Sequence, residues 1–211
     1  NPKNVYTGRG VLEAYANGIE LKENEIAFRC NLITVEEGKI KSYSAGYISK
    51  EESDELIDFL NLKLGNEKVR FYKGLGFKNI LILKNDFSEE IKCYPPHDYY
   101  GYAIEKIMVE GRTEKGKKTA EFLNKLIIES NKYLENHPIN LKRVKEGKEK
   151  ANYIWPWSPG RKPQLEKFYE KFKVKGAVIS AVDLIKGIGK MIGFEVINVP
   201  GATGLWNTNY E

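Results

Sequence analysis

Two pairs of strand-like runs, each joined by a glycine-containing turn, constrain the fold of this chain most. The first pair joins IAFRCNLITV (26–35) through EEGK to IKSYSAGYI (40–48), and its runs contain many β-branched and aromatic residues. The second pair occupies residues 69–84, and its second run is nearly all apolar, which is typical of a strand buried on both faces. We therefore expect a sheet that is covered by helices.

Helical patterns occur between and after these strands. Ser49 and Glu52 have the spacing of a capping box, and the apolar residues that follow predict a helix that ends before Gly65. The apolar periodicity predicts a long helix over about 119–134, preceded by a charged loop at 110–118. Shorter helices are expected over 11–16, over 137–147 and after Pro163.

The last third of the chain has a strand–helix–strand pattern. GAVISAV (176–182) and FEVINV (194–199) flank a short helix, and their crossover should be right-handed if the two strands are parallel. The chain has no internal repeat, and its 211 residues are enough for one sizeable domain. We therefore predict an α/β fold, a single compact domain over residues 1–211, with a mixed β-sheet flanked by helices.

The composition is that of an ordinary globular protein. Hydrophobic residues make up 41% of the chain and charged residues 30%. No run approaches the ~18 apolar residues that a membrane span needs. The net charge of +5 comes from lysines interleaved with glutamates, as in KEGKEK (145–150), which is typical of a solvated surface. We therefore expect neither a nucleic acid nor a membrane as a partner.

The cysteines and histidines argue against a disulfide scaffold and a metal site. Cys30 and Cys93 are expected to be small buried hydrophobes in a reducing compartment. The chain begins at Asn1 without the pattern of a secretory leader, so the predicted location is cytoplasmic. His97 and His137 show no metal-ligand spacing, and we expect each of them to cap a helix or stabilise a turn.

The run 26–35 carries a candidate anion-binding pair. Strand alternation places Phe28 and Cys30 on a core face, with Arg29 and Asn31 on the opposite face. A guanidinium beside an amide suits a planar anion such as phosphate or carboxylate. The alternative is that Arg29 faces solvent and pairs with a glutamate across the hairpin.

The stretch LIKGIG (184–189) is a second candidate. It places Lys186 in the opening turn of a helix, where the helix dipole disfavours a cation by ~0.3–1 kcal/mol. A bound anion would offset this effect, and Gly187 and Gly189 would let a ligand or another backbone come close. The alternative is a helix that begins earlier, with a surface lysine and glycines that ease packing.

Other residues give weaker signals. Arg161 ends SPGR (158–161), a predicted turn, and is either a ligand contact or an exposed loop arginine. Trp155 and Trp157 flank a proline, and we expect one ring in the core and the other near a cleft. There is no nucleophile elbow and no Ser–His–Asp set, so the residues alone indicate an anion-binding domain without a catalytic centre.

An ordered set of motifs gives the chain a resemblance to a known family. The motifs are YTGRGVLEA (6–14), ELKENEIAFRCNLITV (20–35), SAGYI (44–48), HPIN (137–140) with Arg143, AN (151–152), LIKGIG (184–189) and VPGATGLWNTNYE (199–211). Together they closely resemble the archaeal type of 2,3-bisphosphoglycerate-independent phosphoglycerate mutase, a branch of the alkaline phosphatase superfamily. The resemblance implies an isomerase that interconverts 3-phosphoglycerate and 2-phosphoglycerate in glycolysis and gluconeogenesis.

The resemblance also implies a second domain outside these residues. In such enzymes a metalloenzyme domain supplies a serine nucleophile and two divalent metal ions (Mn, Mg, Zn or Co), while an inserted domain closes over phosphoglycerate. The nucleophile precedes the YTGRG segment, and most metal ligands follow the segment that matches 199–211. We therefore expect residues 1–211 to be the inserted domain alone, inactive by itself, with no catalytic residue and no metal ligand.

The same resemblance implies a cationic clamp for the substrate. The expected substrate-binding residues are Arg29, Lys186, Asn31 and Arg161. A clamp of this kind requires positions 29 and 186 to lie close enough to share one small ligand. The chain departs from the family pattern at Tyr43, Tyr47 and Lys78, where many relatives carry arginine. Residues 1–9 and 200–211 are expected to lie close together and to act as hinges, so that closure excludes water from the phosphoenzyme.

Two other interpretations remain open. The net charge and the aromatic content also suit a self-contained module that binds an anionic ligand or RNA. RNA affinity that falls steeply with salt, without a response to phosphoglycerate, would favour that interpretation. The chain could also be the insertion of a related phosphatase or phosphonate enzyme, since one fold can serve different substrates. Assaying the longer enzyme with 3-phosphoglycerate and a divalent metal would separate the mutase from this last possibility.

Overall fold

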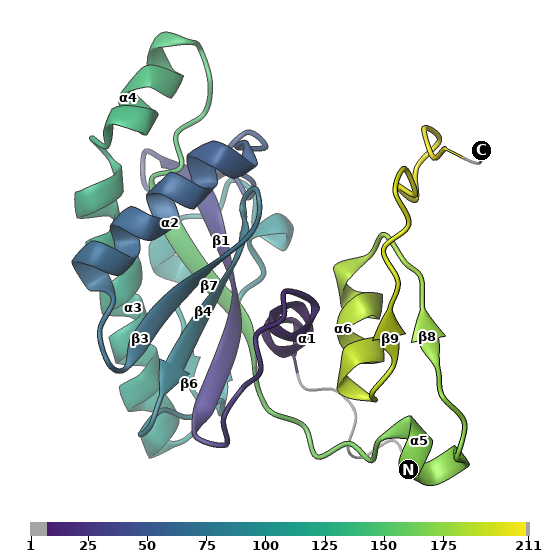
Figure 1. Cartoon of the computed structure of the whole chain (residues 1–211). Coiled ribbons are helices and arrows are strands. Elements are labelled where there is room, and N and C mark those ends of the chain that lie inside the picture. The colour runs from purple at the N-terminus through teal and green to yellow at the C-terminus, as the bar shows by residue number, and fades with distance from the viewer. Residues whose placement is uncertain (1–7, 210–211) are drawn as a thin grey trace.

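A five-stranded antiparallel sheet organises the chain, of which this computed structural model describes residues 8–209 (Figure 1). Its strands are β1 (Glu25–Glu36), β2 (Lys39–Ser42), β3 (Val69–Leu75), β4 (Lys78–Lys84) and β7 (Tyr153–Arg161). β1 pairs with β2, β4 and β7, and β4 pairs with β3. The two predicted hairpins, β1–β2 and β3–β4, are therefore confirmed.

Helices α2 (Lys50–Leu64) and α3 (Glu114–Leu134) cover one face of this sheet. The capping box that begins α2 is confirmed, because the Ser49 hydroxyl accepts from the backbone N–H of Glu52 and the Glu52 carboxylate accepts from that of Ser49. α3 begins earlier than predicted because the Thr113 hydroxyl accepts from the Gly116 N–H at 3.1 Å. The prediction of a loop over 110–118 was wrong for its second half, which forms the first turns of α3.

The main core lies between the sheet and these two helices. It contains the buried side chains Phe28, Leu32, Phe71, Leu81, Ile57 and Leu123. Cys30 is buried in it and Cys93 packs against it, both as free thiols, and burial raises the pKa of each thiol to about 12. The prediction that the cysteines behave as buried hydrophobes is confirmed for Cys30, whereas Cys93 is half-buried and packs against the core.

Short elements connect the strands to the long helices. They are β5 (Ile91–Lys92), η2 (Pro96–Asp98), η3 (Ile104–Lys106), β6 (Glu110–Gly111) and α4 (Pro138–Lys145). His137 caps α4, since its Nδ1 accepts from the Ile139 N–H at 3.3 Å. This confirms the capping role that was predicted for His137.

Helix α1 (Arg9–Ala16) covers part of the opposite face of the sheet. It lies directly on the β1 backbone, because a Cβ added to Gly10 would be only 2.4 Å from the Ala27 carbonyl oxygen. A smaller core forms here from Val11, Leu12, Ala14, Ala27, Ile80, Ile82 and Met191. Glycine at position 10 therefore allows a contact that any larger residue would prevent.

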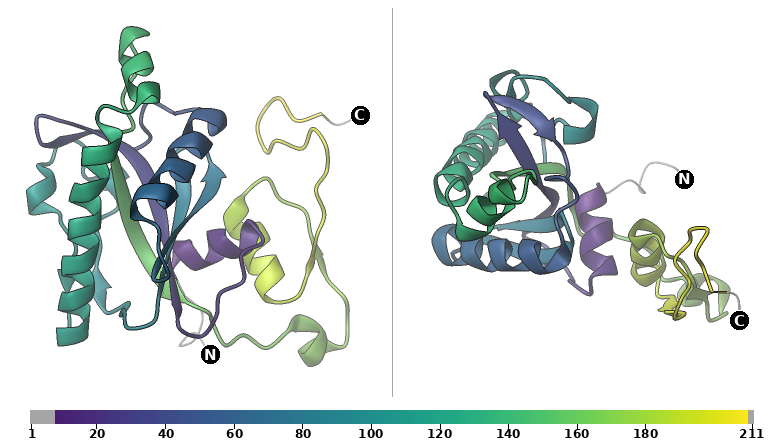
Figure 2. Two further views of the ribbon diagram at one scale, coloured as in Figure 1. Left: turned by 60° about the vertical axis from the view of Figure 1, so that its left-hand side comes forward. Right: turned by 90° about the horizontal axis from the view of Figure 1, so that it is seen from above.

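The last part of the chain forms a small unit beside α1. Its elements are α5 (Phe168–Phe172), β8 (Ala177–Val178), α6 (Asp183–Met191) and β9 (Glu195–Val196). β8 and β9 flank α6 as predicted and are parallel, although they are shorter than expected, and α6 packs on the outer side of α1 (Figure 2). The antiparallel sheet and this parallel pair together confirm the predicted α/β class with mixed pairing.

Two other expectations concern the ends of the chain and membranes. The proposed hinges at 1–9 and 200–211 include residues 1–7 and 210–211, which lie outside the described residues, so their proximity stays a prediction. Within residues 8–209 no helix combines the length and the apolar character that crossing a membrane requires.

Candidate anion-binding site

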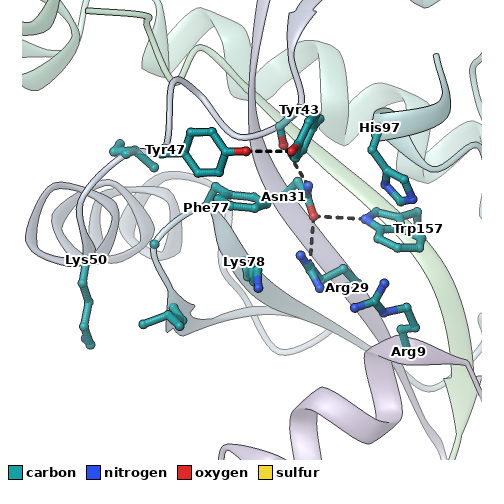
Figure 3. Close-up of a pocket in the computed structure, with 13 residues that line it drawn as sticks. Arg9, Arg29, Asn31, Tyr43, Tyr47, Lys50, Phe77, Lys78, His97 and Trp157 are labelled. Carbon is teal, nitrogen blue, oxygen red and sulfur yellow. Dashed lines mark hydrogen bonds between the residues drawn. The ribbon is translucent and has the colours of Figure 1, made fainter. Parts of the chain in front are cut away.

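A pocket of about 630 Å³ opens on the part of the sheet face that lies beyond α1 (Figure 3). The β1–β4 register pairs Arg29 with Ile80 and Asn31 with Lys78, so these side chains share one face. The residues that line the pocket are Arg9, Arg29, Asn31, Tyr43, Tyr47, Ile48, Lys50, Leu75, Gly76, Phe77, Lys78, His97 and Trp157. Two of the four predicted binding residues, Arg29 and Asn31, therefore lie in one pocket.

Arg29 is buried at the floor of this pocket. Its side chain is only 4% exposed, its Nε donates to Asn31 Oδ1 at 3.0 Å, and its Nη1 pairs with the Glu13 carboxylate. Its guanidinium carbon lies 5.6 Å from the centroid of the Trp157 ring. Burial lowers the pKa of Arg29, and Glu13 opposes that shift. The alternative of a solvent-facing Arg29 was wrong, because the partner carboxylate is on α1 and not across the hairpin.

One carboxylate forms ion pairs with two guanidinium groups at this site. Arg9 Nη2 lies 3.3 Å from the same Glu13 oxygen that Arg29 contacts. The Nε of Arg9 is buried and makes no hydrogen bond. Arg9 lies on the rim, with a side chain that is 39% exposed. The pair of arginines therefore has one positive charge more than its shared partner neutralises.

Lys78 adds a further positive charge. It is half-buried, and within the described part of the chain it makes no ion pair; its Nζ lies 5.7 Å from the centroid of the Phe77 ring. Lys50, also at the pocket, is paired with Asp54. Three cations around a single carboxylate create a positive field in a partly desolvated space, and such a field favours an anionic ligand.

Asn31 connects three other residues of the pocket through hydrogen bonds. Its Oδ1 accepts from Arg29 Nε and, at 3.1 Å, from Trp157 Nε1, while its Nδ2 donates to the Tyr43 carbonyl oxygen at 2.9 Å. Both lone pairs of the amide oxygen are therefore used within the protein. Asn31 orients the guanidinium and the indole, and it has one amide N–H left for a ligand.

An aromatic wall faces these cations. The Tyr43 and Tyr47 hydroxyls are 2.9 Å apart, and this hydrogen bond raises the pKa of Tyr43. The His97 ring packs edge-on against Trp157 with centroids 5.2 Å apart. Trp155 instead is 1% exposed and donates to the Tyr94 carbonyl oxygen. The prediction of one tryptophan in the core and one near a cleft is thus confirmed.

Lys186 lies elsewhere. It is the fourth residue of α6, its Nζ donates to Asn198 Oδ1 at 3.2 Å, and it lines a separate cavity of about 230 Å³. The first turn of α6 carries Asp183, a negative charge that the helix dipole favours. The structure does not bring Lys186 and Arg29 to one cavity, so this chain alone does not form the predicted shared clamp.

The glycines of α6 serve packing. A Cβ on Gly187 would be 2.0 Å from the Leu12 carbonyl oxygen of α1, and a Cβ on Gly189 would be 2.5 Å from the Val178 side chain. The interpretation of glycines that ease packing is the one that Gly189 supports, and Gly187 allows the close approach of another backbone, that of α1.

Arg161 also lies outside the pocket. It ends β7, where its Nε pairs with the Glu89 carboxylate at 2.7 Å and its Nη2 donates to the Phe87 carbonyl oxygen. The predicted turn at 158–161 was wrong, because these residues continue the strand that pairs with β1. Arg161 is therefore neither an exposed loop arginine nor a pocket residue in this structure.

The sequence analysis missed Arg9 and Glu13 as site residues. Their spacing of four in RGVLE is a recognisable helical ion pair, which could have drawn attention to them. Within residues 8–209 no three His, Cys, Asp or Glu side chains gather in an arrangement that could hold a metal ion.

Comparisons with known proteins give one family. The family model described as 2,3-bisphosphoglycerate-independent phosphoglycerate mutase matches residues 1–140. A Methanosarcina acetivorans protein of that name is 49% identical over 211 residues, covering 100% of this chain and 52% of the relative. Methanocaldococcus jannaschii has a 2,3-bisphosphoglycerate-independent phosphoglycerate mutase 1 that is 44% identical over 213 residues, again covering 100% and 52%.

Solved structures agree with the sequence matches. A Pyrococcus horikoshii protein superposes with a TM-score of 0.71 at 32% identity, over 99% of this chain and 47% of that chain. The cofactor-independent phosphoglycerate mutase of Thermoplasma acidophilum gives a TM-score of 0.69 at 29% identity, over 96% and 54%. The chain spans about half the length of the curated relatives it matches. Because the family model matches more than half of its residues, the chain belongs to the 2,3-bisphosphoglycerate-independent phosphoglycerate mutase family.

Proposed function

We propose that this chain is the substrate-binding and closing part of a phosphoglycerate mutase that interconverts 3-phosphoglycerate and 2-phosphoglycerate through a phosphoserine. Family membership supports the reaction, and the charge of the pocket supports the binding role. The observation that carries the proposal is that two guanidinium groups share the Glu13 carboxylate, while Lys78 has no ion pair within residues 8–209. Phosphoglycerate, with a carboxylate and a phosphate, suits this excess of positive charge.

The proposed roles follow from the contacts. Arg9, with a side chain that is 39% exposed on the rim, approaches the ligand first, and Arg29 beneath it offers a rigid guanidinium oriented by Asn31. Lys78, across β1 and β4 from Asn31, contacts a second anionic group of the same ligand. Because the aromatic wall limits access of water, each of these charges acts more strongly than it would on an open surface.

The chemical step is assigned to the rest of the enzyme. We propose that the serine nucleophile and two divalent metal ions belong to the part of the polypeptide outside these 211 residues. When bound there, the metals would stabilise charge on the transferring phosphoryl group. The 211-residue chain is therefore expected to bind phosphoglycerate weakly and to convert none of it.

A binding titration tests the assignment of the pocket. The isolated chain is titrated with 3-phosphoglycerate at constant ionic strength and followed by NMR shifts of Trp157. Lys78→Met should weaken binding by about tenfold or more, since a hydrogen bond to a charged group contributes roughly 1.5–3 kcal/mol. Lys39→Met, which removes an exposed lysine at the start of β2, is the matched control and should leave the affinity unchanged.

Three outcomes would count against the proposal. Equal affinity in Lys78→Met and the unsubstituted chain would contradict the assignment of the site. No response to 3-phosphoglycerate, combined with RNA binding that weakens steeply with salt, would favour an RNA-binding module. Hydrolysis of phosphate esters without mutase activity in the longer polypeptide would favour a related phosphatase.

A further inference from the structure

Arg143, on α4, is a buried arginine that lies outside the pocket. Its side chain is 3% exposed, and each of its three nitrogens contacts a different segment of the chain. Its Nη2 donates to the Ala45 carbonyl oxygen at 2.7 Å, its Nε donates to the Glu149 carbonyl oxygen at 2.7 Å, and its Nη1 pairs with the Glu52 carboxylate. A guanidinium is a rigid planar group, so these contacts fix the three segments relative to one another.

The HPIN motif (137–140) explains why Arg143 points towards these segments. Asn140 is buried, its Oδ1 accepts from the Ala151 N–H at 2.8 Å, and its Nδ2 donates to the Ala151 carbonyl oxygen at 3.0 Å. Residues three apart on a helix lie on the same side. The contact of Asn140 with Ala151 therefore fixes the rotation of α4 that directs Arg143 inward.

The loop between β2 and α2 has an unusual backbone where Arg143 contacts it. Ala45, Gly46 and Tyr47 have φ values of 49°, 61° and 53°, so three successive residues are left-handed. The Cβ atoms of Ala45 and Tyr47 disfavour this conformation. Such a conformation persists only where the surrounding structure imposes it. The hydrogen bond from Arg143 to the Ala45 carbonyl oxygen is a constraint of this kind.

Hydroxyl groups of the loop hold its N–H groups. Ser42 Oγ accepts from the Gly46 N–H at 3.0 Å, and Ser44 Oγ accepts from the Tyr47 N–H at 3.3 Å. The first of these bonds is exposed and the second is partly buried, so water competes with both. The bond from Arg143 to the loop is buried, which makes it the constraint that water does not replace.

The same loop forms part of the anion-binding pocket (Figure 3). Tyr43 and Tyr47 belong to its aromatic wall, and the Tyr43 carbonyl oxygen accepts from Asn31 Nδ2. Asn31 Oδ1 in turn accepts from Arg29 Nε and from Trp157 Nε1. A displaced loop would therefore change both the wall and the group that orients the buried guanidinium.

We propose that Arg143 is a positioning residue of the anion-binding pocket. It holds the left-handed loop at Ala45, and the loop holds Asn31 through the Tyr43 carbonyl, so that the Arg29 guanidinium keeps its binding orientation. Arg143 acts through these groups and lies outside the pocket lining. The proposal rests on the proposed function, because it takes this pocket to be the place where phosphoglycerate binds.

Two indole N–H groups distinguish a local effect from a loss of overall stability. Trp157 Nε1 donates to Asn31 in the pocket, whereas Trp155 Nε1 donates to the Tyr94 carbonyl oxygen at 2.8 Å. In Arg143→Met we expect hydrogen exchange of the Trp157 indole to accelerate by about tenfold or more, and that of Trp155 by less than about threefold. Equal acceleration of both indoles would show a purely structural role and would overturn the proposal.

Affinity for 3-phosphoglycerate is measured by titration of the same 211-residue chain. Arg143→Met should weaken binding by about fivefold or more, because a guanidinium without a fixed orientation has to be ordered when the ligand binds. Lys150→Met is the matched control: it removes the ion pair with Glu135 in the segment that follows α4 and should leave the affinity within about twofold. Unchanged affinity in Arg143→Met would contradict the positioning role.

A substitution in the loop tests whether the loop connects Arg143 to the pocket. Glycine adopts the left-handed region without the steric cost that alanine has, so Ala45→Gly alone should leave the affinity within about twofold. Combined with Arg143→Met, it should restore the affinity by about threefold or more, although the ion pair with Glu52 stays lost. A double variant that binds as weakly as Arg143→Met would show that the loop is not the connection and would overturn the proposal.

A second variant keeps the test decisive if Arg143→Met does not fold. Arg143→Lys keeps a positive charge opposite Glu52 but lacks the planar group that reaches Ala45 and Glu149 together, and the same changes in exchange and affinity are expected of it. If the unsubstituted chain does not bind 3-phosphoglycerate, while loss of Arg143 still accelerates exchange of the Trp157 indole alone, the positioning role holds and the proposed function fails. Binding that no Arg143 variant weakens has the opposite meaning.

Discussion

Replacing Glu13 with glutamine tests the electrostatic core of the site. The Arg29 and Glu13 side chains are only 4% and 8% exposed, so Glu13→Gln leaves a buried guanidinium without a counter-charge. Removing one partner of a buried ion pair costs about 3–5 kcal/mol. We expect a loss near the lower limit, about 3 kcal/mol, because the hydrogen bond to Asn31 and the contact with Trp157 remain. The lost contact of Arg9, which is 39% exposed, adds at most ~1 kcal/mol.

The assay is urea denaturation, first in chloride and then in phosphate at matched ionic strength. Phosphate should restore more of the free energy of unfolding in Glu13→Gln than in the unsubstituted chain, because the anion takes the place of the carboxylate. Glu23→Gln is the control; Glu23 is 79% exposed and pairs with Lys162 at 3.6 Å, so it should change the free energy of unfolding by less than ~0.5 kcal/mol. A loss below about 1 kcal/mol in Glu13→Gln would refute the claim that this carboxylate compensates a buried charge.

Three other predictions use the packing and the burial of single side chains. Gly187→Ala should lower the free energy of unfolding by about 1–3 kcal/mol in urea, because the new Cβ would meet the Leu12 carbonyl; a neutral effect would contradict that contact. Burial lowers the pKa of His137 below 6.5, so the native state binds fewer protons than the unfolded chain. The contribution of His137 to the free energy of unfolding is therefore complete above pH 6.5 and is lost as the pH falls through the folded-state pKa. His137→Asn can still cap α4 and should flatten this part of the plot of unfolding free energy, measured in urea, against pH. An unchanged slope would contradict the assignment. Because burial raises the pKa of Cys30 to about 12, iodoacetamide should label it only after unfolding, and rapid labelling of the native protein would contradict its burial.

Local sequence patterns were enough to predict much of the fold. The capping box at Ser49 and the alternation of β1, which places Phe28 and Cys30 in the core and Arg29 and Asn31 in the pocket, depend on residues close in sequence, and both predictions were confirmed. The start of α3 was missed because the residues that follow Thr113 are charged and lack the apolar periodicity that indicates a helix. SPGR (158–161) was taken for a turn because of its proline and glycine, yet within residues 8–209 β7 pairs with β1 alone and tolerates prolines as an edge strand.

The site was less predictable because it depends on tertiary contacts. Strand alternation was enough to place Arg29 and Asn31 on one face, but the main partner of Arg29 is Glu13, on a helix that packs across the sheet. The unfavourable position of Lys186 suggested a bound anion. Asp183 and the contact with Asn198 instead provide local compensation, which a dipole argument applied to one residue did not consider.

Helix α1 joins the chemistry of the pocket to a distant part of the molecule. One side of the helix lies on β1 through Gly10, and the other side receives Gly187 of α6 through Leu12, the residue next to Glu13. A substitution on α6 that widens this spacing would shift the carboxylate and thereby alter the charge that an incoming anion encounters. Selection for altered ligand preference should therefore recover changes on α6 as readily as changes in the residues that touch the ligand.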